Sequence, residues 1–67
     1  MARRKALTAR ATVRLLKQHG FVEHHQKGSH LVLMHPDSNR IVVVPMHARD
    51  VPRGTLLSIL KSAGIDL

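Results

Sequence analysis

The middle of the chain constrains the fold most, because between residues 21 and 45 three short runs typical of strands alternate with two turn signals. The third run, residues 41–44, consists only of isoleucine and valine, which favour strands. Lys27-Gly28 marks the first turn, and residues 36–39 (Pro, Asp, Ser and Asn) mark the second. Short turns join antiparallel neighbours. We therefore expect strands at residues 21–26, 29–35 and 41–44 in an antiparallel meander.

One amphipathic helix is predicted before this meander in the sequence, and another is predicted after it. Thr8 can cap a first helix that runs to about residue 19, and a second helix is expected over residues 53–63. Gly20 and Gly64 follow these segments and suit the left-handed end of a helix. The apolar stripes are Ala9, Val13 and Leu16 in the first helix, and Leu56, Ile59, Leu60 and Ala63 in the second. The sequence predicts an α-β-β-β-α protein of the α+β class, with both helices on one sheet face and the other face open.

The size and the residue types limit the other possibilities. With 67 residues and no cysteine, the chain is expected to form one domain, residues 1–67, without disulfides. Residues 1–7 form a basic N-terminal tail in this interpretation. No long apolar stretch follows the tail, so we expect neither a secretory signal nor a membrane span, and the expected location is the cytoplasm.

The charge balance favours a polyanionic partner. Eleven Lys and Arg residues oppose four Asp and Glu residues, which gives a formal net charge of +7. Such a surface suits nucleic acid, although an acidic protein partner is also compatible with it. Phe21 is the only aromatic residue and is expected inside the core, so RNA recognition by stacking on aromatic rings is not expected.

The candidate for chemistry is His30, which directly follows Lys27-Gly28-Ser29 at the start of a predicted strand. Gly28 lets a ligand approach the backbone closely, while Lys27 supplies positive charge and Ser29 a hydroxyl donor. If the hairpin closes symmetrically about Lys27-Gly28, His25 lies opposite His30 on the same face. A phosphodiester would fit beside this group.

RNA supplies the reaction that such a group could catalyse. The 2′-hydroxyl attacks the adjacent phosphorus when a base removes its proton, and the leaving 5′-oxygen needs an acid. Histidine suits both proton transfers, and a cation stabilises the phosphorane, so neither a metal nor another cofactor is required. From these residues alone, a structural turn followed by a half-exposed histidine is the simpler interpretation.

The histidines at positions 19, 35, 24 and 25 offer weaker signals for chemistry. His19 lies in the last turn of the first helix, where its charge would meet the negative end of the helix dipole. His35 precedes a turn proline and is expected to be exposed. His24 and His25 are neighbours on a strand, so they should point to opposite faces and not form a metal pair. A zinc site made only of histidines has no spacing signature here.

An ordered set of short motifs extends from the first helix to the end of the chain. The motifs are Gly20-Phe21, Gln26-Lys27-Gly28-Ser29-His30, His35-Pro36-Asp37, Val42-Val43-Val44-Pro45-Met46-His47, Gly54-Thr55-Leu56 and Ile59-Leu60-Lys61-Ser62-Ala63-Gly64. With these spacings the set resembles the HicA (YcfA-like) family of toxin messenger-RNA endonucleases. The resemblance implies a fold similar to double-stranded-RNA-binding domains and metal-independent cleavage of messenger RNA. It makes His30 the catalytic residue and a HicB antitoxin the protein partner.

Three further residues are candidates for contact with RNA. Members of the family often carry arginine at the position of His25, so phosphate binding there would be weaker or pH-dependent. His47 could be a second proton-transfer or phosphate-binding group, or could order its loop by a hydrogen bond. Thr55 could cap the second helix, whose N-terminus would favour a phosphate, or could simply start the helix.

Two other functions remain open from the sequence. A non-catalytic double-stranded-RNA-binding module would share the fold class and the charge but would not turn over RNA. A small basic protein associated with DNA or the ribosome would bind without depending on His30. The ordered motifs favour the toxin.

Overall fold

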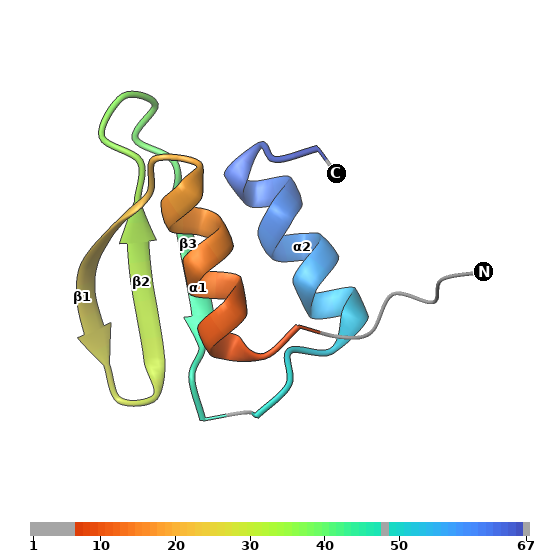
Figure 1. Cartoon of the computed structure of the whole chain (residues 1–67). Helices are drawn as coiled ribbons and strands as arrows, with labels where there is room; N and C mark the ends of the chain where they lie inside the picture. Colours follow the sequence, from red (N-terminus) through yellow and green to blue (C-terminus); the bar gives the residue numbers. More distant parts are fainter. Residues whose placement is uncertain (1–6, 48, 67) are drawn as a thin grey trace.

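The elements of the structure, a computed structural model that describes residues 7–47 and 49–66, follow the predicted order α-β-β-β-α (Figure 1). The first six residues of the predicted tail lie outside the described residues. The elements are α1 Ala9–Gln18, β1 Val22–Lys27, β2 His30–Met34, β3 Ile41–Pro45 and α2 Arg53–Ala63.

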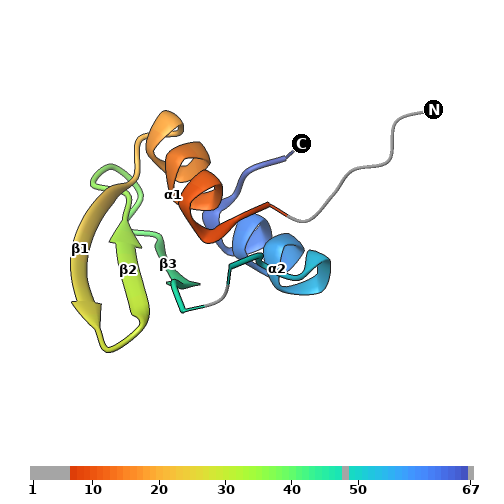
Figure 2. The ribbon, with the colours of Figure 1, turned by 60° about the horizontal axis from the view of Figure 1, so that its bottom comes forward.

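The three strands form one antiparallel sheet in the order β1-β2-β3, and both helices lie on the same face of it (Figure 2). Side chains alternate between the two faces of a strand. Leu33 and Val44 face the helices and are fully buried, whereas Val43 on the opposite face is 44% exposed. The predicted two-layer arrangement with one open sheet face is confirmed.

Helix α1 begins at a side-chain cap. The Thr8 hydroxyl oxygen accepts a hydrogen bond from the Ala11 N–H at 3.0 Å, as the predicted cap requires. The hydroxyl of Thr12 is satisfied inside the core because it donates to the Thr8 carbonyl at 2.9 Å. The chain leaves the helix through Gly20 at φ +91°, a conformation that a side chain would strain.

Helix α2 begins without a side-chain cap. Pro52 is the residue before it and makes no side-chain hydrogen bond, while the Leu56 N–H donates to the Pro52 carbonyl at 2.8 Å. Of the two interpretations of Thr55, the helix cap is therefore wrong, because the helix has already begun at Arg53 and Thr55 lies in its first turn. Gly64 ends it in the left-handed conformation, as expected.

The core is aliphatic and encloses the single aromatic ring. Phe21 is buried, as expected, and its N–H donates to the Leu16 carbonyl at 3.1 Å. Leu7 packs against this core, and its carbonyl accepts a hydrogen bond from the Val51 N–H at 2.7 Å. The buried apolar residues are Ala9, Val13, Leu16, Phe21, Leu31, Leu33, Val42, Val44, Val51, Leu56, Ile59, Leu60 and Ala63.

The first hairpin turns one residue later than we expected. Lys27 pairs with His30, so Gly28 and Ser29 form the two-residue turn. Gly28 has φ +60°, and Ser29 is outside the left-handed region. A turn with a positive φ only at its first central residue is the type II′ turn, whose twist matches that of antiparallel strands. The prediction of a turn at Lys27-Gly28 is wrong for this reason, and the register changes with it.

Candidate functional site

His30 is the first residue of β2 and is exposed on the open face of the sheet. Its partner on β1 is Lys27, and its partner on β3 is Pro45. Residues directly opposite each other share a face, with their Cβ atoms about 5 Å apart. The corrected register therefore places a lysine, and not His25, beside His30.

The turn next to His30 leaves its backbone accessible. Apart from Gly28 itself and its two chain neighbours, no described atom lies within 4 Å of the position that a Cβ on Gly28 would occupy. The Gln26 side-chain amide donates to the Gly28 carbonyl at 3.1 Å, and the Ser29 carbonyl accepts a hydrogen bond from the Met46 N–H at 2.6 Å. These bonds fix the turn from both sides while its outer surface stays open to a ligand.

The hydrogen bond from Met46 to this turn brings His47 to the same place. The imidazole rings of His30 and His47 have centroids 6.1 Å apart, with an interplanar angle of 64°. Both residues are exposed, and within residues 7–47 and 49–66 neither ring takes part in a hydrogen bond. The site therefore contains two imidazoles and one ammonium group, and this set is called the His30 cluster: His30, His47 and Lys27.

His25 lies on the same face but further from the turn. It pairs with Val32, which is two residues along β2 from His30. A β-bulge between Glu23 and His25 shifts the register, and the Nδ1 atoms of His24 and His25 are 2.7 Å apart. The prediction that these two rings point to opposite faces is wrong, because the bulge interrupts the alternation.

Two histidines at the other end of the sheet are used by the fold. The Nδ1–H of His19 reaches the Leu15 carbonyl at 3.0 Å, which agrees with the structural role predicted for it. His35 is half-buried rather than exposed, so that prediction is wrong. Its ring meets Phe21 edge-on at 5.1 Å, and its Nδ1 accepts a hydrogen bond from the Asp37 N–H at 3.1 Å.

A basic groove runs beside α1, on the helix side of the sheet. Arg10, Arg14 and Lys17 project from one flank of the helix into a hollow of about 390 Å³. Lys17 also pairs with Glu23 at 2.6 Å, but both side chains are about half exposed, so this ion pair stabilises the fold little. The residues that line this α1 groove are Arg10, Val13, Arg14, Lys17, Glu23, Gln26, Leu31 and Met46. Sequence reasoning missed this groove, although the spacing i, i+4, i+7 of the three cations is a signal that could have indicated it.

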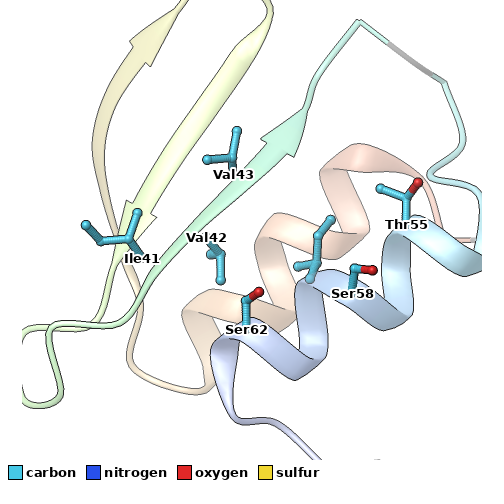
Figure 3. Close-up of a pocket in the computed structure, with 7 residues that line it drawn as sticks. Ile41, Val42, Val43, Thr55, Ser58 and Ser62 are labelled. Atoms are coloured by element: carbon cyan, nitrogen blue, oxygen red, sulfur yellow. The ribbon is translucent and has the colours of Figure 1, made fainter.

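Thr55 belongs to a different hollow, between β3 and α2 (Figure 3). This β3 groove has a volume of about 330 Å³. Its lining residues are Ile41, Val42, Val43, Thr55, Ser58, Ile59 and Ser62. The structure thus brings Lys27, Gly28, Ser29 and His47 to His30, while Thr55 contributes to a separate surface.

In the part of the chain that the structure describes, no three His, Asp or Glu side chains are grouped as metal ligands would be. Neither of its two helices is long and apolar enough to cross a bilayer.

Comparison with known proteins identifies the family. No curated protein matches the chain. The sequence model of the family described as "HicA toxin of bacterial toxin-antitoxin" matches residues 9–65, a range that includes both helices and all three strands. The resemblance found in the ordered motifs is confirmed. The chain therefore belongs to the HicA toxin family and is the toxin of a toxin–antitoxin pair.

Proposed function

We propose that this toxin is an endoribonuclease that cleaves messenger RNA without a metal, and that His30 transfers a proton in the reaction. The observation that carries the proposal is the His30 cluster, in which two exposed imidazole rings lie 6.1 Å apart beside Lys27. Imidazole is the side chain best suited to exchange protons near neutral pH.

The reaction needs two proton transfers on opposite sides of one phosphorus atom. A base removes the proton of the 2′-hydroxyl, whose oxygen then forms a bond to phosphorus while the bond to the 5′-oxygen breaks. The attacking and leaving oxygens are roughly in line, so the acid that protonates the 5′-oxygen stands opposite the base. In this proposal His30 and His47, whose ring centroids are 6.1 Å apart, supply one base and one acid.

Groups in and beside the Gly28-Ser29 turn stabilise the negative charge of the phosphorane. The ammonium group of Lys27 shares the sheet face with His30, and the open backbone at Gly28 lets phosphate oxygens approach closely. Ser29 adds a hydroxyl donor at the next position. His25, two positions from Lys27 on β1, contacts the neighbouring phosphate or sugar.

The rest of the RNA strand is held by charge along the α1 groove. Arg10 and Arg14 lie in that groove without a carboxylate partner in the described residues, whereas Lys17 is shared with Glu23. Contacts of this kind bind the sugar–phosphate backbone and do not read sequence. Binding through the groove also fits a double-stranded-RNA-binding module without activity, and the experiment separates the two.

The test is cleavage of messenger RNA by the purified chain in excess chelator, with analysis of the product ends. The proposal predicts products that end in a 2′,3′-cyclic phosphate, and no cleavage of the same sequence made as DNA. A single strand that is RNA except for one 2′-deoxy nucleotide should resist cleavage only after that nucleotide. RNA that is bound but stays intact would support the non-catalytic alternative, and loss of activity with chelator would exclude the metal-free mechanism.

A further inference from the structure

The two edges of the sheet differ in how they are protected. All six residues of β1, Val22–Lys27, are exposed, most of them are polar, and a β-bulge interrupts the strand between Glu23 and His25. Charges and bulges are the devices that keep an edge strand from pairing with another chain. In β3, by contrast, residues 41–44 are uncharged and β-branched, and only Pro45 at the end of the strand blunts the edge.

The outer edge of β3 offers free backbone groups. On the inner side, the Met46 N–H donates to the Ser29 carbonyl, and the His35 N–H donates to the Arg40 carbonyl at 2.9 Å. Hydrogen-bonded and non-hydrogen-bonded pairs alternate along an antiparallel ladder. Counting inward from those two bonds, the residues that bond to β2 are Val42 and Val44. The N–H and C=O groups of Ile41 and Val43 are therefore directed away from β2, toward the free edge.

The β3 groove lies directly beside this edge. Figure 3 shows Ile41 and Val43 on the strand side and the hydroxyl residues Thr55, Ser58 and Ser62 along the facing side of α2. Ile41 is 58% exposed and Val43 is 44% exposed, so an added strand would cover apolar surface as well as pair with the backbone. The hydroxyls on the opposite wall can donate to or accept from its polar groups.

We propose that the antitoxin of this pair docks here, by adding an extended segment to the outer edge of β3 as a fourth strand. This inference rests on the family of the chain and does not require the ribonuclease activity. Addition of a strand to an exposed edge is a general mode of peptide recognition, in which backbone bonds give affinity and alternate side chains give specificity. The docking segment should alternate apolar residues, which contact Ile41 and Val43, with polar residues.

The charge of this chain disfavours a second copy as the occupant of the β3 edge. Two copies would each carry a formal charge of +7 into the complex, whereas an antitoxin of acidic composition would be attracted. A stable interface buries about 800 Å² on each partner, which is more than one short strand supplies. The antitoxin should therefore extend from the β3 edge onto the neighbouring apolar residues of the open face, Val32 and Met34.

The experiment measures binding of the antitoxin encoded beside the toxin gene to the full-length chain. Val43→Pro removes one outward N–H and leaves the bonds to β2 in place, and Ser58→Arg fills the groove from α2. We expect each change to weaken binding at least about tenfold, whereas Val43→Thr, which keeps the N–H and the β-branched shape, stays within about threefold of the parent. Ser58→Arg lies on an exposed helix position and does not depend on whether the proline variant folds.

Amide hydrogen exchange of the unaltered chain gives a second readout. In the complex, exchange at the Ile41 and Val43 amides should slow at least about 100-fold, as expected for newly buried strand bonds. Exchange at the rate of the free toxin, or parent-like binding by Ser58→Arg, would overturn the proposal. Protection that appears in the toxin alone as its concentration rises would assign the edge to a second copy. RNA cleavage by the free variants is measured in parallel, so that failure of docking and failure of the ribonuclease proposal are told apart.

Discussion

The two histidines at the ends of β2 have opposite surroundings. His30 starts the strand on the open face, beside a turn whose backbone is accessible and 6.1 Å from the ring of His47. His35 directly follows the strand and is held on three sides. Its ring packs edge-on against Phe21, its Nδ1 accepts a hydrogen bond, and its Nε2 would lie 2.7 Å from a Cβ on Gly20.

The difference teaches how a fold uses the same side chain for structure or leaves it for chemistry. The ring of His35 packs against Phe21 and Gly20, and its Nδ1 accepts a hydrogen bond from the second turn, so this side chain serves the fold. The ring of His30 is exposed, and removing it should cost the fold little. We therefore expect substitutions at the two positions to separate activity from stability.

Expression in cells should show the largest contrast between the two histidines. His30→Ala should no longer arrest growth, because losing a proton-transfer group lowers the rate by about 10²–10⁴-fold. His35→Ala should still arrest growth below its melting temperature. Growth curves after induction, with equal protein levels checked by blotting, measure this. If His30→Ala arrested growth as strongly as the parent does, His30 would not have a chemical role that distinguishes it from His35.

His47→Ala tests whether His30 acts together with a second histidine. If His47 supplies the second proton transfer, cleavage by this variant should fall about 100-fold with little change in RNA binding. His19→Ala is the control, since that ring bonds to Leu15 at the far end of α1. Single-turnover rates and filter binding measure the two quantities. A cleavage rate within a factor of three of the parent would show that His47 does not supply the second proton transfer.

Gly20→Ala tests the structural role of His35. The substitution forces a side chain into φ +91° and toward the Nε2 atom of His35, so it should destabilise the protein by about 1–3 kcal/mol. His35→Ala should cost about 1–2 kcal/mol through the lost ring contact and hydrogen bond. In the double variant the side chain added at position 20 no longer meets the ring. The double variant should therefore lose less unfolding free energy than the sum of the losses in the two single variants. Urea unfolding of the four proteins checks this, and strict additivity would show that the ring does not press on Gly20.

Arg14→Ala tests whether RNA binding extends beyond the His30 cluster. The slope of log K against log salt concentration should decrease by about 1, because one phosphate contact is lost. Lys61→Ala, an exposed cation on α2 outside the α1 groove, should leave the slope unchanged. Equal slopes for parent and Arg14→Ala would place the RNA elsewhere on the surface.

Most of the fold could be predicted from local patterns. The cap at Thr8, the glycine ends of both helices and the apolar stripes fixed the helices closely, because each signal acts within a few residues. The β-branched run fixed β3. The start of α2 was also predicted, but the possible cap at Thr55 was wrong because Pro52 precedes the helix and no side chain caps it.

The sequence named the residues that form the His30 cluster, but it did not predict their arrangement. Lys27 and His47 were candidates, but a one-residue shift of the turn decided that Lys27, and not His25, faces His30. The β-bulge that brings the rings of His24 and His25 together has no local signal in the sequence. The burial of His35 depends on Phe21 and Gly20, which are distant in the chain and meet it only after folding.

The most direct test of the central claim is the single-turnover rate of messenger-RNA cleavage in chelator by the parent, His30→Ala and His35→Ala. Each protein is assayed at a temperature where circular dichroism shows it to be folded. We expect His30→Ala to cleave at least about 100-fold more slowly than the parent, and His35→Ala to cleave at nearly the parent rate. Cleavage by folded His30→Ala at the parent rate would contradict the assignment of His30 as the proton-transfer residue.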